Sequence, residues 1–134
     1  MKKGAGVILY SYDKDNNICV LLGKRIYNPG KGNWGIPGGG MEDCDEDDCQ
    51  NTAIRECLEE TNIKIEKPLI EIDRLHFPHL EWITYIAEVA YDKRNLFVSE
   101  MEESAWFNID NLPSPLVNKI DEQLIELKRI LYKK

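Results

Sequence analysis

Acidic side chains crowd one short stretch of the sequence. The segment GIPGGGMEDCDEDDCQNTAIRECLEETNI, from Gly35 to Ile63, holds nine of the chain's 24 acidic residues. Carboxylates this close repel one another unless cations lie among them. In helical geometry Glu56, Glu59 and Glu60 share about 100° of one face, and their hard oxygen atoms suit Mg²⁺ or Mn²⁺. The segment therefore indicates a divalent metal site, which a phosphate-bearing substrate would complete.

Two other interpretations of this segment compete with a metal site. A lone acidic helix face is usually only solvated surface, so the glutamates by themselves decide little. The alternation of aspartates between Asp43 and Asp47 is similar to a calcium-binding loop. Such a loop requires glycine at its sixth position and glutamate at its twelfth, where this chain has Asp48 and Ile54. The calcium loop is therefore excluded.

Hydrophobic patterns predict the elements that must position these carboxylates. Apolar spacing of three and four residues predicts helices over 45–61, ending at Asn62, and over 116–131. The segment 28–40 contains six glycines and two prolines and is expected to be a loop that allows close backbone approach. β-Branched and aromatic runs predict strands over 4–12, 17–25, 68–77, 81–91 and 105–109, the first two forming a hairpin. The order predicts an α+β or α/β fold with a mixed sheet.

Length and composition limit the possible partners. The 134 residues predict a single domain over 1–134, and the net charge of −7 argues against a nucleic-acid polymer as partner. The first apolar run is short and broken by charge, so we expect no secretion signal, no membrane partner and a cytoplasmic location. A homodimer is compatible with these features. The cysteines have no metal-binding spacing and are expected to be reduced thiols; they are Cys19, Cys44, Cys49 and Cys57.

The acidic segment resembles the signature box of the Nudix hydrolases, G-x5-E-x7-R-E-U-x-E-E-x-G-U, where U is aliphatic. The residues RECLEETNI, from Arg55 to Ile63, match it at the arginine, the three glutamates and the last aliphatic residue. Similar flanks occur in AGVILY…VLLGKR, NWGIPGGG and EMEESAWFNIDNLP, so the resemblance covers most of the chain. It implies the Nudix fold, an α/β/α sandwich in which helices flank a mixed sheet.

Two departures from the box concern the loop before the helix. Counting forward from Gly39 places the leading glutamate at residue 45, and counting back from Arg55 places it at residue 47. The loop is therefore two residues longer than the family's, and Glu46 is the expected substitute for that glutamate. Asn62 replaces the final glycine, which its tolerance of the left-handed conformation allows.

The resemblance also implies roles for particular residues. The expected metal ligands, for Mg²⁺ or Mn²⁺, are the Gly38 carbonyl and the side chains of Glu56, Glu59 and Glu60, with Glu56 doubling as the base. Arg55 would hold the loop through a carboxylate partner. Gly38 and Gly39 would let a diphosphate come close, and Arg25 would contact a phosphate. A further catalytic glutamate is expected at Glu100, with Glu103 as the alternative.

The nucleotide is less strongly indicated than the reaction. Nudix enzymes split nucleoside diphosphates linked to another group. Asn118, at the start of the last predicted helix, resembles the base-reading asparagine of the mutator-preventing branch, which removes oxidised guanine nucleotides such as 8-oxo-dGTP, although asparagine there could also cap the helix. Pro78 is similar to a proline associated with ADP-ribose hydrolysis, although it could be only a turn residue. A nucleoside triphosphate is thus the first expected substrate, and ADP-ribose is the second. The third alternative is that the chain is a non-catalytic sensor module.

Overall fold

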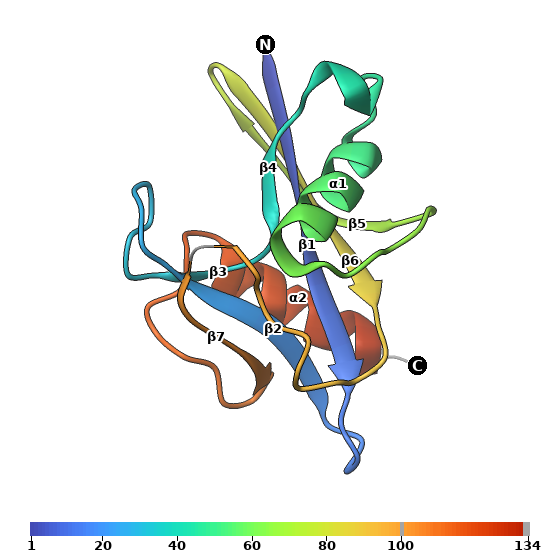
Figure 1. The fold of residues 1–134 in the computed structure, drawn as a ribbon, viewed down its shortest axis with the longest axis vertical. Helices are drawn as coiled ribbons and strands as arrows, with labels where there is room; N and C mark the ends of the chain where they lie inside the picture. The colour runs from blue at the N-terminus through green and yellow to red at the C-terminus, as the bar shows by residue number, and fades with distance from the viewer. Residues whose placement is uncertain (100, 133–134) are drawn as a thin grey trace.

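The structure, a computed structural model, describes residues 1–99 and 101–132. Strands β1 and β2 form the predicted hairpin, and Figure 1 shows the arrangement of all the elements. In chain order these are β1 (Lys2–Tyr12), β2 (Ile18–Arg25), β3 (Trp34–Gly35), β4 (Gly38–Gly40), the 3₁₀ turn η1 (Asp43–Asp45), α1 (Cys49–Thr61), β5 (Ile70–Phe77), β6 (Leu80–Glu88), β7 (Met101–Asn108) and α2 (Ile120–Tyr132).

The strands form one mixed sheet. Its main order is β3-β2-β1-β6-β5, and β4 and β7 pair with β1 and β2 respectively. The β1–β6 pair is parallel, whereas the other pairs are antiparallel. The predicted mixed sheet is thus confirmed.

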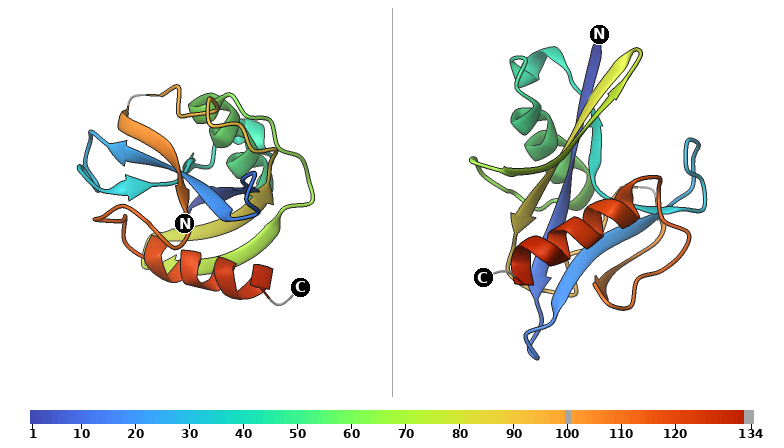
Figure 2. Two further views of the ribbon diagram at one scale, coloured as in Figure 1. Left: turned by 90° about the horizontal axis from the view of Figure 1, so that it is seen from below. Right: turned by 180° about the vertical axis from the view of Figure 1, so that it is seen from behind.

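One helix covers each face of the sheet. In Figure 1, α1 lies in front of β1 and α2 lies behind the sheet; Figure 2 shows the opposite side with α2 in front. Side chains alternate along each strand, so β1 contributes Val7 and Leu9 to the core under α1 and Ile8 and Tyr10 to the core under α2. The α/β/α sandwich is confirmed.

The helix α1 is shorter than predicted. The sequence pattern indicated a start at residue 45, but the helix begins at Cys49, because Glu46 and Asp47 both adopt positive φ and cannot continue a helix. Asp48 caps the start by accepting a hydrogen bond from the Gln50 amide. The helix ends as predicted at Asn62, whose φ of 61° is left-handed.

Two other segments also differ from the sequence prediction. The expected loop over 28–40 contains β3 and β4, because strand pairing needs only backbone groups: Gly38 to Gly40 pair with Gly4 to Gly6 of β1. Helix α2 begins at Ile120 rather than at residue 116, since Leu116 instead bridges to Trp34 and Lys119 has a φ of 76°. Among the described residues no helix is long and apolar enough to cross a membrane.

Candidate functional site

An arginine–aspartate pair fixes the loop before α1. Arg55 donates from Nε and Nη2 to the two carboxylate oxygens of Asp45, at 2.9 and 3.0 Å. Asp45 is only 2% exposed and also accepts hydrogen bonds from the Thr52 hydroxyl and the Glu42 amide. The bidentate hydrogen bonds from Arg55 hold the pKa of Asp45 well below its usual range. The loop is therefore tied to the helix by a buried ion pair.

The leading glutamate of the box is replaced by Asp45, and the expectation of Glu46 was wrong. Glu46 is exposed and closes η1 in the left-handed conformation. With Asp45 in that position, the two extra residues of the box fall between Asp45 and Arg55. Glu46 and Asp47, at φ 55° and 56°, form the turn that absorbs them. The shorter aspartate suffices because Arg55 also donates to the Gly40 carbonyl, at 2.9 Å, which draws the loop close.

Two carboxylates meet against the glycines of β4. The Glu60 side chain accepts a hydrogen bond from the Gly38 amide at 3.1 Å, and the Glu56 carboxyl lies beside it. A Cβ atom added at Gly39 would lie 2.5 Å from the Glu56 carboxyl carbon, so a side chain at this position would require the Glu56 carboxyl to move. Burial and the neighbouring Glu56 carboxyl raise the pKa of Glu60 above its ordinary value.

The third predicted ligand, Glu59, lies further out. Its side chain is 56% exposed and pairs with Arg55 Nη1 at 3.2 Å, while the same nitrogen lies 3.0 Å from Glu56. Within the ranges 1–99 and 101–132, no three acidic, histidine or cysteine side chains are placed as a ready metal-binding group. The arginine cation thus lies between the carboxylates of Glu56 and Glu59.

The donor set nevertheless suits a hard divalent cation. Two adjacent carboxylates on rigid backbone, one half-buried and destabilised by the other, gain most from a cation placed between them. Glu56 and Glu60 would hold it, and Glu59 could join them, because among the described residues its exposed side chain is paired with Arg55 alone.

Arg25 holds the loop beside this site. It ends β2 and donates from Nε to the Pro29 carbonyl at 2.8 Å. Its positive charge favours the ionised form of Glu60. A cation that acts on this carboxylate is compatible with a phosphate contact.

The remaining sequence candidates come from other parts of the chain. Glu100 falls outside the described residues, and Glu103 is exposed on β7. Asn118 is exposed in the turn before α2, and in the part of the chain that the structure describes its side chain caps nothing. Pro78 and His79 form the tight turn between β5 and β6. The turn interpretation of Pro78 is therefore sufficient to explain the residue.

Sequence reasoning missed Trp82, whose indole packs against the glycines of β1 and β4 beside the site. Its indole lies so near Gly4, Gly6 and Gly38 that a Cβ at any of them would approach the ring to 2.7–3.1 Å. The indole also donates to the Thr84 hydroxyl at 3.2 Å. No local sequence pattern indicates this contact, because strand pairing brings the three glycines next to the tryptophan.

The comparisons with known proteins agree with this geometry. The model of the NUDIX domain family matches residues 2–127, so the chain belongs to the Nudix family. Its membership and its similarity to Nudix structures support a hydrolase that acts on phosphoanhydride bonds.

Solved structures with the same fold share about a fifth of the sequence or less. The NUDIX domain of Shewanella oneidensis NrtR, complexed with ADP ribose, has a TM-score of 0.77 and 19% identity over 96% of this chain and 87% of that one. An Enterococcus faecalis MutT/nudix family protein has a TM-score of 0.80 and 18% identity over 99% and 62%. A Caenorhabditis elegans Ap4A hydrolase has a TM-score of 0.75 and 20% identity over the whole of both chains.

Some of these relatives are longer proteins. The chain spans 62% of the E. faecalis protein and 62% of S. oneidensis NrtR in its complex with a 27mer DNA. The expectation that no nucleic-acid polymer is a partner therefore stays a prediction, based on the charge of this chain.

Proposed function

We propose that the chain is a pyrophosphohydrolase that requires Mg²⁺ or Mn²⁺ and splits a nucleoside triphosphate, such as 8-oxo-dGTP, into the monophosphate and pyrophosphate. The observation that carries this proposal is the Glu56–Glu60 carboxylate pair pressed against Gly38 and Gly39. Such a pair is costly to keep without a cation, which a metal–diphosphate substrate would bring.

Each residue of the site has a role in this proposal. When bound, the divalent ion neutralises the diphosphate and activates water. Glu56, Glu59, Glu60 and the Gly38 carbonyl would hold the ion. The Glu56 carboxylate would take the proton of the attacking water, Arg25 would contact a phosphate, and Arg55 would keep the loop in place. Glu100 remains a proposal for a further catalytic group, and Asn118 one for contact with the base.

ADP-ribose is the second candidate substrate, because an S. oneidensis NUDIX domain of the same fold was crystallised with it. Turnover of 8-oxo-dGTP, the four deoxynucleoside triphosphates and ADP-ribose, with and without excess chelator, tests both. We expect the fastest hydrolysis with 8-oxo-dGTP and none with chelator. Undiminished turnover in chelator would contradict the metal mechanism, and preference for ADP-ribose over every triphosphate would contradict the substrate.

Asn118 allows a sharper test of substrate choice. Its exposed side chain caps no helix among residues 1–99 and 101–132, so Asn118→Ala should leave the melting temperature unchanged. If it contacts the base, the variant should lose roughly 5- to 150-fold of the preference for oxidised guanine. Serine is too short to reach a base, so an unchanged preference in Asn118→Ser would remove Asn118 from the site.

A further inference from the structure

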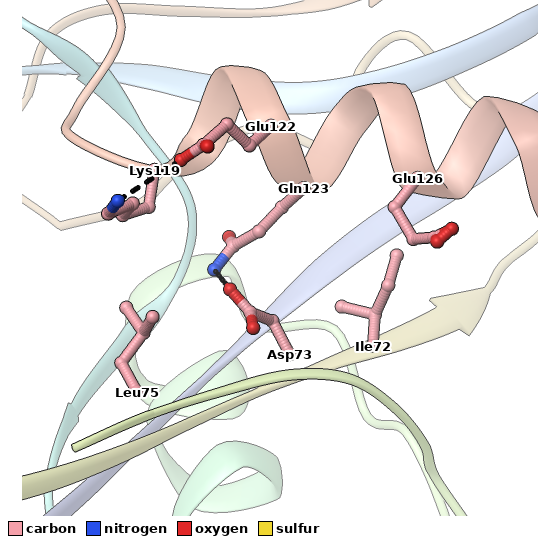
Figure 3. Close-up of a pocket in the computed structure, with 7 residues that line it drawn as sticks. All are labelled: Ile72, Asp73, Leu75, Lys119, Glu122, Gln123 and Glu126. Carbon is pink, nitrogen blue, oxygen red and sulfur yellow. Dashed lines mark hydrogen bonds and ion pairs between the residues drawn. The ribbon is translucent and has the colours of Figure 1, made fainter.

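A cavity lies between α2 and β5, on the sheet face opposite α1. Its volume is about 350 Å³, within the range of roughly 300–1,000 Å³ typical of small-molecule sites. Figure 3 shows the helix side chains of the cavity above those of the strand. The cavity is lined by Ile72, Asp73, Leu75, Lys119, Glu122, Gln123 and Glu126.

A bulge in β5 builds the floor of this cavity. Glu71 pairs with Tyr85 and Asp73 pairs with Thr84, so Ile72 is an extra residue in the strand. Bulges of this kind re-aim side chains. As a result Asp73 lies beneath α2 and faces Gln123, as the close-up shows (Figure 3).

Gln123 carries a buried acceptor without a partner. The residue is 4% exposed, and its Nε2 donates to Asp73 Oδ2 and to Thr84 Oγ1, both at 3.1 Å. These two bonds use both amide hydrogens and fix the orientation of the side chain. Oε1 accepts no hydrogen bond from any described residue. Since an unsatisfied buried acceptor costs about 1–3 kcal/mol, this atom points to a ligand that donates.

The polar groups around Oε1 narrow the chemistry of that ligand. Asp73 and Glu122 add carboxylate acceptors, whereas Lys119 supplies a donor, 3.4 Å from Glu122, at the edge of the cavity. Ile72 and Leu75 supply apolar surface. The lining therefore fits a flat group with adjacent N–H donors and one acceptor beside them.

Contiguous side chains connect the cavity to the carboxylate pair. Leu75 pairs with Trp82 across β5 and β6, and the Trp82 indole lies against Gly38, whose amide binds Glu60. From β5 through β6 and β1 to β4 there are three strand spacings, about 14 Å in all. An extended nucleotide can span that distance, so a base in the cavity would leave the phosphates at β4, beside the glycines that Glu56 and Glu60 contact.

We propose that the cavity binds the substrate's base and that Gln123 and Asp73 select a guanine-type edge. Guanine presents two adjacent N–H groups next to a carbonyl oxygen, which match Gln123 Oε1, the Asp73 carboxylate and Lys119. Adenine presents ring-nitrogen lone pairs next to its single amino group, and these would face the acceptors. This inference rests on the proposed function and adds residues that the sequence did not indicate.

Binding of GMP and AMP without metal tests the inference separately from hydrolysis. Isothermal titration calorimetry should show the parent protein binding GMP more tightly than AMP. Gln123→Met keeps the side-chain length but removes the acceptor, so it should reduce the GMP preference roughly 5- to 150-fold. Asp73→Asn, which keeps the size of the side chain, should also reduce it.

A matched control is Gln50→Met. The Gln50 oxygen accepts from the Leu69 amide, away from the cavity, so this variant should keep the parent GMP preference. Melting temperatures identify any variant that fails to fold, and Asp73→Asn then replaces Gln123→Met as the deciding variant.

The outcomes separate this inference from the proposed function. Equal binding of GMP and AMP by the parent, or an unchanged GMP preference in a folded Gln123→Met variant, overturns the base-reading inference even if triphosphates are hydrolysed. A GMP preference that both cavity variants abolish supports it, and absence of hydrolysis in that same protein would contradict only the proposed function.

Discussion

The two ends of helix α1 hold acidic side chains in opposite electrostatic situations. Before its first turn, Asp45 is buried and receives two hydrogen bonds from Arg55, which lower its pKa. In the last turn, Glu60 is half-buried beside Glu56, and burial with that second carboxyl raises its pKa.

The different environments of Asp45 and Glu60 indicate a structural role for the first and a functional role for the second. A carboxylate whose cation belongs to the protein stabilises the fold, whereas a carboxylate destabilised by burial and by a neighbouring carboxyl is favoured by a ligand that brings a further cation. The same chemical group thus stabilises the fold at one end of the helix and, in the function proposed above, binds a ligand at the other.

The largest expected effect is on catalysis, at the Glu60 end. Glu60→Gln should lower the rate of metal-dependent hydrolysis by a factor of about 100 or more, since it removes a charged ligand. Because glutamine also removes repulsion with Glu56, the melting temperature in chelator should not fall. Steady-state kinetics and thermal unfolding measure the two effects.

Added Mg²⁺ provides the control for this comparison. It should raise the melting temperature of the parent protein, since a ligand at 100 times its Kd stabilises by about 2.7 kcal/mol, and it should do so less in Glu60→Gln. A Glu60→Gln variant that is fully active, or one whose melting temperature falls in chelator, would show that Glu60 is structural.

The next effect is on stability, at the Asp45 end. Asp45→Asn leaves Arg55 without its charge partner, and breaking a buried pair costs about 3–5 kcal/mol. Urea unfolding at pH 7 measures this loss, and Glu46→Gln, on the exposed neighbour, is the matched control that should change little.

The same pair predicts an acid dependence of stability. The folded-state pKa of Asp45 lies below the ordinary value of 3.8, so its contribution is present above that pH and is lost as the pH falls through the folded pKa. The free energy of unfolding should therefore fall below pH 4 by more in the parent than in Asp45→Asn. Equal acid dependence in both proteins would remove Asp45 as the cause.

The smallest expected effect is that of a reductant. Cys44 is exposed and Cys49 is buried, on the two sides of the Asp45 loop, and all four cysteines are free thiols in the structure. Dithiothreitol should change neither the melting temperature nor the activity, because Arg55 rather than a covalent bond holds this loop. A marked loss of stability would reveal a Cys44–Cys49 disulfide.

Periodic and capping signals carried most of the fold prediction. The hairpin, the mixed sheet and the end of α1 at Asn62 follow from local patterns. The first residues of the two helices do not follow from local patterns. Glu46, Asp47 and Lys119 adopt positive φ because of the loops in which they lie, and a helical pattern does not indicate this. Strand β4 was missed because glycines carry no hydrophobic pattern, although their backbones pair as any others do.

The candidate site could likewise be predicted only in part from the sequence. Helical spacing could place Glu56, Glu59 and Glu60 on one face, but it could not show that Arg55 would draw Glu59 outward and leave Glu56 and Glu60 together. The partners Asp73 and Gln123 are 50 residues apart, and no local pattern links them.

The indole of Trp82 gives the protein an internal optical probe. Of its three tryptophans, Trp34 is buried against Phe107 and Trp106 lies on β7, whereas Trp82 lies between the α2 cavity and Gly38 of β4. Indole fluorescence depends on the polarity around the ring, so a ligand that crosses this surface changes the emission of one residue in particular. Occupancy of the site can thus be followed in the unlabelled protein.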